Sequence, residues 1–525
     1  MKHIDKLLLG MMVLSLCLAQ ACSPPPIQET KTEASAAIYF PSDEWRTSTP
    51  EEQGVDSEPI LQMLREIQER NIDIHSFLLV RNGYLVTEAY FDPYARNIKH
   101  PVYSVTKSVI SILTGIAIHE GYIESVDQKA LDFFPEIAKK EKDEWLLNLT
   151  IKDLLTMSAG YNTVTIPYAE VLATKDASFE TVEHILTYNS ILVEPGTVFY
   201  YDSGLPHLMS AIIQETTSMN TREYAQEKLF GPLGITDISW QTDPGGIPLG
   251  NTGLTLSPLD MAKLGYLYLN HGVWNGEQIV PREWVDESTS KHIETKGLMN
   301  AAEDDGYGYY WWMDAYGGYS AHGFGGQYIF VVPQKNLVAV FTSGLADPDF
   351  PTPRKLMEKY ILEAAGSTQA LPPSEAAGEL EAIIERIANP ETQPPPLPEI
   401  AQRISGKTFH ITEGPAFYFN EVTLTFEDGV NLYRSVTTWP DGGYDVLGGL
   451  DNRFHVDEIT HPQVITVAVK GYWEDEKTFI EILKILSDIG NVIHTYTFKG
   501  DRVTIDVGSS MNSDNFQMKG EMIDQ

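Results

Sequence analysis

A serine followed three positions later by a lysine, Ser104 and Lys107, is the strongest chemical signal in the sequence. The apolar run Val-Ile-Ser-Ile-Leu-Thr-Gly-Ile-Ala-Ile that follows predicts a buried helix, on which the two side chains share a face. The N-terminus of such a helix supplies backbone N–H groups and a positive dipole end, where a developing oxyanion is stabilised. A lysine buried by an apolar helix loses its proton readily and can then activate a serine. The pattern predicts nucleophilic catalysis by Ser104 with Lys107 as its base.

The spacing alone leaves an alternative open, in which Ser104 only caps the helix and Lys107 is exposed. The same spacing recurs at Ser288 and Lys291, within the polar stretch Asp-Glu-Ser-Thr-Ser-Lys-His. Because no apolar helix follows this second pair, we interpret it as solvated surface.

The elements that must position Ser104 extend from about Tyr39 to Gly366, where helix and strand signals alternate. Residues 76–90 predict a hairpin closed by a type I′ turn at Asn82-Gly83. Residues 328–333 and 337–342 predict two further strands, residues 254–270 contain a helical pattern, and residues 354–365 predict a closing helix.

Composition narrows the chemistry further. The 525 residues carry a net charge of −36, which argues against a nucleic-acid partner and against electrostatic docking on an anionic membrane. The two cysteines, Cys17 and Cys22, both lie near the N-terminus, so the rest of the chain has no thiol nucleophile or cysteine metal site. His75, His119 and His184 lack metal-ligand spacing, and we expect neither a metal nor an organic cofactor.

The first 21 residues read as a signal peptide, with Lys2 and Lys6 before a short apolar run. Ala19-Gln20-Ala21 before Cys22 resembles a bacterial lipobox, which implies export and lipid attachment at Cys22 to the cell envelope. Ordinary secretion with a free thiol is the alternative. Residues 22–38 predict a flexible tether, and membrane contact is expected only through the lipid.

The remaining chain divides into a hydrolase domain at 39–366, a linker at 367–399 and a C-terminal domain at 400–525. The linker contains a short helix at 375–388 and a proline-rich spacer at 390–398. After it, short strands separated by turn residues predict an antiparallel sheet or a small barrel. Its segment 471–479 carries charged and aromatic residues and is a candidate substrate contact, with cleft covering or a purely structural role as alternatives.

Six segments occur in an order that resembles the serine β-lactamase-like hydrolases, which include class C β-lactamases, D-Ala-D-Ala carboxypeptidases, esterases and amide hydrolases. They are Ser76–Gly83, Tyr103–Ser108, Leu154–Gly160, Pro195–Tyr201, Leu229–Ile235 and His322–Gln327. The resemblance implies an α+β fold, in which helices flank an antiparallel sheet and a helical subdomain forms the other wall of the cleft.

By the same resemblance, Ser104 is the nucleophile, Lys107 its helical lysine, and Tyr201 the tyrosine that shuttles the proton. A neighbouring cation lowers the pKa of a phenol, so we expect Tyr201 to be a usable base. The motif Tyr201-Asp202-Ser203 has serine where the family has asparagine, which puts β-lactam recognition in doubt. Ser203 either contacts substrate or caps the following helix, and Asp202 is expected to face solvent or to cap.

The third family motif corresponds to Ala321-His322-Gly323 or to His322-Gly323-Phe324. Gly323 would let a ligand backbone approach closely, and the N–H of Phe324 would complete an oxyanion hole. His322 would orient the substrate carbonyl or assist the tyrosine. The motif lacks the family's lysine, which favours neutral esters or amides over carboxylate-bearing β-lactams. The aromatic cluster at 306–312 would form a strand that walls the cleft.

Together these features predict an exported serine hydrolase that cleaves an ester or amide bond of a small or peptide-like substrate through an acyl-enzyme. The alternatives are a β-lactamase or D,D-peptidase, and a catalytically weak binding protein on the same fold. The sequence leaves the oligomeric state open.

Overall fold

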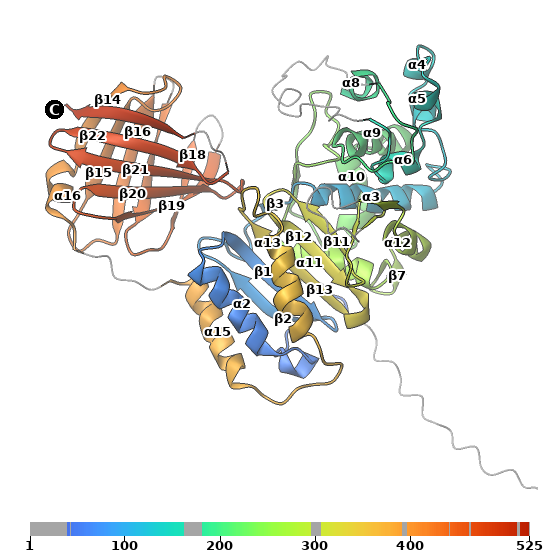
Figure 1. The fold of residues 1–525 in the computed structure, drawn as a ribbon, viewed down its shortest axis with the longest axis horizontal. Coiled ribbons are helices and arrows are strands. Elements are labelled where there is room, and N and C mark those ends of the chain that lie inside the picture. The colour runs from blue at the N-terminus through green and yellow to red at the C-terminus, as the bar shows by residue number, and fades with distance from the viewer. Residues whose placement is uncertain are drawn as a thin grey trace, which may run out of the picture. The chain divides into compact units, whose positions relative to one another are not determined.

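The computed structural model describes residues 39–41, 44–161, 181–188, 190–295, 306–390, 396–439, 442–460, 464–511 and 515–523. The predicted signal peptide, Cys22 and the tether lie outside the described residues. The described residues from Phe40 onward form one compact unit, shown in Figure 1.

The hydrolase domain is built around an eight-stranded antiparallel sheet of order β2-β1-β13-β12-β11-β10-β9-β8. The predicted hairpin and the two predicted strands are confirmed. Asn82 and Gly83 both have positive φ, as a type I′ turn requires. The strands are β1 Ile74–Arg81, β2 Tyr84–Tyr90, β8 Ile293–Glu294, β9 Gly306–Tyr307, β10 Trp312–Met313, β11 Tyr319–Gly323, β12 Gln327–Val332 and β13 Leu337–Ser343.

Helices cover both faces of this sheet (Figure 1). Alternate strand residues point to opposite faces, so Leu79 and Phe341 pack in one core cluster while Leu78 and Val340 pack in the other. The first cluster is covered by α2 Ser57–Glu69, α13 Thr352–Leu356, the π-helical turn η6 Met357–Ile361, α14 Leu362–Ala364 and α15 Glu375–Ala388. The second is covered by α3 Val105–His119, α11 Pro258–Leu269 and α12 Arg282–Ser288.

A helical subdomain shares the second core cluster with α3, and α9 packs against α3. Reciprocal capping boxes at Thr150 with Asp153 and at Asn220 with Glu223 begin two of its short helices. Its elements are η2 Ala130–Phe133, α4 Pro135–Ala138, α5 Glu144–Asn148, α6 Ile151–Leu155, α8 Thr181–Tyr188, α9 Gly204–Thr217, α10 Thr221–Ala225 and η3 Gln226–Phe230. Smaller elements are η1 Glu51–Gln53, β3 His100–Pro101, β4 Ser239–Trp240, β5 Leu254–Leu256, β6 Val273–Trp274, β7 Glu277–Gln278 and η5 Pro333–Lys335.

The helix predicted within the linker has a larger role than a spacer would have. Leu380, Ile383 and Ile387 of α15 are buried in the same core cluster as α2. Part of the 367–399 range therefore belongs to the hydrolase core, which extends to Ala388.

The C-terminal domain is a ten-stranded sheet of order β17-β16-β15-β14-β23-β22-β21-β20-β19-β18. A pairing of β17 with β19, at Gly449 and Lys470, closes nine strands into a barrel, and β18 pairs along the first part of β19. The predicted small barrel is thus confirmed. Its elements are α16 Glu399–Ile404, β14 Lys407–Glu413, β15 Glu421–Phe426, β16 Leu432–Trp439, β17 Gly442–Gly449, β18 His455–Thr460, β19 Val464–Trp473, β20 Thr478–Ile485, β21 Asn491–Lys499, β22 Arg502–Ser509 and β23 Phe516–Met522.

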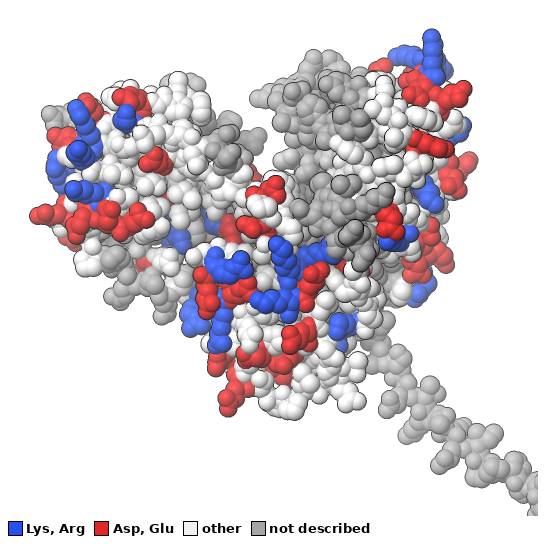
Figure 2. Space-filling model, viewed as in Figure 1, with Lys and Arg blue, Asp and Glu red and all other residues white. Residues whose placement is uncertain are grey.

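The surface charge is distributed rather than gathered. On the face shown in Figure 2, acidic and basic side chains lie intermixed on the described surface. Among the described residues, no helix has both the length and the apolar character needed to cross a bilayer.

Candidate active site

Ser104 stands at the start of α3, immediately after a strained residue. Tyr103 has φ +46°, a left-handed conformation that bulky side chains rarely adopt. The hydroxyl of Tyr103 donates a hydrogen bond of 2.9 Å to Asp488, and its ring lies 5.5 Å from that of Phe324. These contacts hold the turn that presents Ser104, whose side chain remains partly accessible.

Lys107 is directed at the Ser104 hydroxyl from one turn along the helix. Its Nζ lies 2.7 Å from Ser104 Oγ and 3.0 Å from the backbone oxygen of Asn251. The side chain is only 1% exposed. Burial lowers its pKa to about 7, against an opposing effect of the Asp202 carboxylate. A large share of the amine is therefore neutral near pH 7 and can accept the serine proton.

The alternative interpretation of this pair, a capping serine with an exposed lysine, is wrong. Ser104 occupies the N-cap position of α3 but makes no side-chain capping hydrogen bond. The lysine is buried, as the apolar helix predicted.

Tyr201 lies beside the pair, with its ring centroid 4.9 Å from Lys107 Nζ and its hydroxyl hydrogen-bonded to Ser104. The expectation that a cation lowers its pKa is wrong, because burial raises the pKa to about 12 despite that hydrogen bond. The phenol therefore keeps its proton at neutral pH. Lys107, and not Tyr201, is the group able to accept a proton in the free protein.

For each of the two residues after Tyr201, the structure favours one of the two expected roles. Asp202 is buried rather than facing solvent, and its Oδ1 accepts a hydrogen bond of 2.8 Å from Gly204 N at the start of α9. Ser203 makes no capping hydrogen bond to this helix. Capping thus falls to Asp202, and a substrate contact remains the interpretation of Ser203.

Trp312 joins His322 to Tyr201. The indole stacks on the imidazole at 5.1 Å with an interplanar angle of 7°, and on the Tyr201 ring at 6.0 Å with an angle of 24°. Burial lowers the pKa of His322 well below its usual value, so the ring is neutral. The single strand predicted over the aromatic cluster at 306–312 is wrong, because two short antiparallel strands, β9 and β10, lie there and are joined by a turn.

A hydrogen-bond chain orients His322. Its Nε2 lies 2.8 Å from Ser320 Oγ, and that hydroxyl donates a bond of 2.8 Å to Asp314 Oδ2. Since the serine proton is directed to Asp314, Nε2 of His322 carries the proton that Ser320 accepts. Nδ1 of the neutral ring then carries a lone pair and can accept a hydrogen bond.

Gly323 and Phe324 place β11 against the segment that precedes Ser104. A Cβ on Gly323 would lie 2.3 Å from the backbone oxygen of Val102, so glycine is required by the protein's own backbone rather than by a ligand. Phe324 is 46% exposed and its ring packs edge-on against Phe350 at 4.6 Å.

The second serine–lysine match is not a site. Ser288 is buried, so its interpretation as solvated surface is wrong; its hydroxyl contacts Val285 O at 3.3 Å. Lys291 instead pairs with Glu294 at 2.7 Å. The structure brings together Ser104 and Lys107.

The barrel contributes Asp488 and Ile489, from the connection between β20 and β21, to the surroundings of Ser104. A Cβ on Gly325 would lie 2.2 Å from Ile489 Cδ1, so this connection packs closely on the loop after β11. The segment 471–479, our candidate for a substrate contact, instead packs Trp473 and Phe479 into the core of the barrel.

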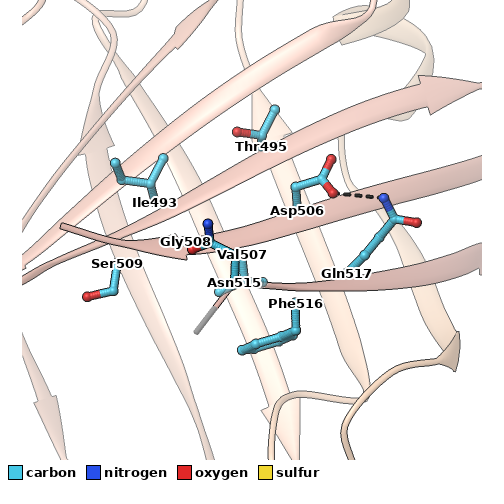
Figure 3. Close-up of a pocket in the computed structure, with 9 residues that line it drawn as sticks. All are labelled: Ile493, Thr495, Asp506, Val507, Gly508, Ser509, Asn515, Phe516 and Gln517. Atoms are coloured by element: carbon cyan, nitrogen blue, oxygen red, sulfur yellow. Dashed lines mark hydrogen bonds between the residues drawn. The ribbon is translucent and has the colours of Figure 1, made fainter. Parts of the chain in front are cut away.

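Other parts of the described chain offer less chemistry. Within the described residues, no group of three or more His, Cys, Asp or Glu could hold a metal ion. A hollow of about 530 Å³ on β21, β22 and β23 contains a hydrogen bond between Asp506 and Gln517 (Figure 3). The residues that line it include no lysine or histidine that could serve a serine as base.

A serine contacted by a buried lysine of lowered pKa at a helix N-terminus, beside an antiparallel sheet, defines a serine hydrolase of the serine–lysine type. The sequence profile of the Beta-lactamase family matches residues 62–362, more than half of the chain. The chain belongs to this family, and it is a hydrolase.

Among its relatives is a 6-aminohexanoate-dimer hydrolase of Paenarthrobacter ureafaciens, 24% identical over 345 residues that span 62% of this chain and 86% of the relative. Similar solved structures include an octameric penicillin-binding protein homologue from Pyrococcus abyssi, with 16% identity, a TM-score of 0.47 and coverage of 88% and 99% of the two chains. A family VIII carboxylesterase has 14% identity, a TM-score of 0.49 and coverage of 61% and 99%.

Sequence reasoning missed two contributors to the site, Asn251 and Asp488. Asn251 acts through its backbone oxygen, which no residue type reveals. Trp312 belongs to the aromatic cluster that was predicted to wall the cleft. Its stacking on His322 and Tyr201 could not be predicted, because it depends on tertiary contacts. Asp488 comes from a different domain and had no local signal.

Proposed function

We propose that the protein hydrolyses neutral esters or amides through an acyl-enzyme on Ser104. The observation that carries the proposal is the 2.7 Å contact between Ser104 Oγ and the Nζ of Lys107, whose pKa is lowered to about 7. A serine hydroxyl alone is a weak nucleophile, and an adjacent neutral amine is a base matched to neutral pH.

In the first half of the reaction, Lys107 accepts the Ser104 proton while Oγ bonds to the carbonyl carbon and the carbonyl electron pair moves to oxygen. Backbone N–H groups near Ser104, with that of Phe324 as the candidate from the third motif, stabilise that oxyanion. Collapse of the tetrahedral intermediate breaks the bond to the leaving group, which takes a proton that Tyr201 relays from Lys107. Water then attacks the acyl-serine by the same route, releasing the acid and restoring the hydroxyl.

The substrate class follows from the third motif. His322 is neutral and Gly323 has no side chain, so this motif offers no cation to a substrate carboxylate. The neutral imidazole can instead accept a hydrogen bond from the N–H of an uncharged amide, or from a donor elsewhere in an ester substrate. The relative named as a 6-aminohexanoate-dimer hydrolase supports including amides.

A β-lactamase or D,D-peptidase is the second candidate, because Ser104, Lys107 and Tyr201 match the motifs of those enzymes. A binding protein without turnover is the third, because Ser203 and His322 depart from the motifs. The neutral lysine at hydrogen-bond distance from the serine favours catalysis over binding alone.

The test is intact-protein mass after exposure to a fluorophosphonate and, separately, to a penicillin. We expect an adduct with the fluorophosphonate that Ser104→Ala abolishes. Ser288→Ala removes the serine of the second serine–lysine match, and this variant should be labelled as the wild type is. Labelling by both reagents would favour the β-lactam alternative, and labelling by neither would overturn the proposal in favour of a binding protein.

We further propose that the protein is exported and anchored through lipid on Cys22. The short apolar run after Lys2 and Lys6 and the small residues before Cys22 support this. Expression in bacteria with a labelled fatty acid should tag the wild type but not Cys22→Ser. Equal labelling of both chains, or of neither, would favour ordinary secretion.

A further inference from the structure

The barrel encloses a second cavity, of about 300 Å³, that plays no part in the chemistry at Ser104. It lies at one end of the barrel, where strand ends and the connection between β14 and β15 meet. Its lining residues are Phe417, Tyr418, Phe419, Trp439, Tyr444, Ile459, Ile465, Val467, Leu483, Ile485, Val492 and His494. Cavities of this size at the mouths of β-barrels are a common form of small-molecule site.

Strand alternation separates this cavity from the hollow in Figure 3. Val492 and His494 of β21 face the cavity, whereas Ile493 and Thr495 of the same strand line the external hollow. The cavity is therefore lined by side chains that point to the inside of the barrel.

The lining is apolar and uncharged. None of the described lining residues is Lys, Arg, Asp or Glu. The lining also carries polar groups, among them Tyr418, whose hydroxyl lies 2.8 Å from Nε2 of His494. Burial raises the pKa of Tyr418, so its hydroxyl remains protonated.

Beneath the cavity, a buried carboxylate fixes the orientation of His494. Glu481 accepts hydrogen bonds from His494 Nδ1 at 2.8 Å, from Tyr496 at 3.1 Å and from Tyr433 at 3.0 Å. These bonds hold the pKa of Glu481 below its usual value despite complete burial. Because the carboxylate is already satisfied by donors within the barrel, it offers no free charge to a ligand, and the network forms a rigid polar floor.

Exposed apolar side chains mark the open end. Phe417, which lines the cavity, is 80% exposed, and Val464, adjacent to the lining residue Ile465, is 61% exposed. Large apolar side chains at such exposure are expected where an apolar molecule enters.

We propose that this cavity binds a small uncharged amphiphile, with its apolar body among the aliphatic and aromatic side chains and one oxygen at Tyr418 and His494. The volume accommodates on the order of ten to fifteen non-hydrogen atoms. A charged ligand is disfavoured because the lining supplies no counter-ion. The site is independent of Ser104.

The test uses the full-length protein and 4-hexylphenol, which carries an apolar chain and one hydroxyl, with binding followed by calorimetry. We expect saturable binding of one equivalent, with 4-hexylbenzoate binding about tenfold more weakly because its carboxylate would be buried without a partner. Ser104→Ala should bind 4-hexylphenol as the wild type does.

Two substitutions on one strand provide the matched pair. Ile459→Trp fills the cavity and should weaken binding by at least about tenfold, whereas Val456→Trp places the same ring on the 48% exposed outer position and should change it less than about twofold. Tyr418→Phe, which removes only a hydroxyl, should weaken 4-hexylphenol about tenfold and leave hexylbenzene unchanged. Absence of saturable binding to the wild type, equal effects of the two tryptophans, or loss of binding in Ser104→Ala would each overturn the proposal.

Discussion

The buried lysine that makes Ser104 reactive should also cost the protein stability. Replacing it as Lys107→Met keeps the length of the side chain and removes its charge. We expect this variant to be inactive and yet more resistant to unfolding than the wild type at neutral pH. Active-site groups held in unfavourable surroundings commonly show this exchange of stability for activity.

The magnitude follows from the pKa shift. The Lys107 pKa falls from 10.5 to about 7 on burial, a difference of roughly 3.5 units, which corresponds to about 5 kcal/mol. The methionine leaves Ser104 Oγ and Asn251 O without the lysine amine, which costs about 1–3 kcal/mol. The net expectation is a gain of about 2–4 kcal/mol below pH 7.

The sign depends on pH. Between pH 7 and 10.5 the unfolded chain holds a proton on Lys107 that the folded chain has released, so the stability of the wild type rises with pH across that window. The cost is complete below pH 7 and disappears near 10.5. The advantage of Lys107→Met should therefore shrink steadily as pH increases.

The assay is urea unfolding of both chains from pH 6.5 to 9.5, followed by tryptophan fluorescence. Comparison at each pH cancels the titration of every other group. Lys263→Met is the matched control: Lys263 is also buried, but it lies 3.5 Å from the Asp260 carboxylate. Its removal should destabilise the protein. If Lys107→Met is the less stable chain at pH 6.5, or if its advantage does not vary with pH, the lysine is not neutral in the folded protein.

Three further outcomes are expected. The kcat/KM for an activated ester should rise about tenfold per pH unit below pH 7 and level off above it, and a flat dependence from pH 5 to 9 would contradict a titrating lysine base. His322→Phe keeps a ring against Trp312 but lacks the acceptor nitrogen, so kcat/KM should fall while circular dichroism stays unchanged; wild-type activity would remove His322 from the site. A chain ending at Asn389 should keep the thermal transition of the hydrolase domain. A chain ending at Gly366 loses α15 and should melt at a lower temperature. Equal melting temperatures would mean that α15 adds nothing to the stability of the core.

The parts of the fold that were predictable from sequence depend on short-range patterns. The hairpin at Asn82-Gly83 was predicted from turn chemistry, and β12 and β13 from continuous apolar runs. The Ser104–Lys107 contact was predicted because three residues of helix fix the distance between the two side chains.

What sequence could not supply depends on long-range packing. Ser288 lies in a polar stretch yet is buried, because its surroundings come from other elements, such as Tyr268 on α11. The helix at 375–388 was predicted, but its docking on α2 was not, since an amphipathic helix does not reveal its partner. The pKa of Tyr201 was predicted in the wrong direction because burial raises it more than the hydrogen bond with Ser104 lowers it.

The state of Lys107 is set by a balance between two features that meet at the start of α9. Burial among α3 and its neighbours lowers the lysine pKa, and the Asp202 carboxylate opposes it, which leaves the pKa at about 7 rather than lower. Asp202 is in turn held by the Gly204 N–H at that helix N-terminus, next to Tyr201. One helix end therefore lies next to the phenol that we propose as the proton relay, and it holds the carboxylate that keeps the lysine pKa near 7. A lysine that was buried without this carboxylate would have a lower pKa and would be a weaker base. A lysine in direct contact with a carboxylate would remain protonated. The adjacent residues Tyr201 and Asp202 therefore link the proposed proton relay to the strength of the base.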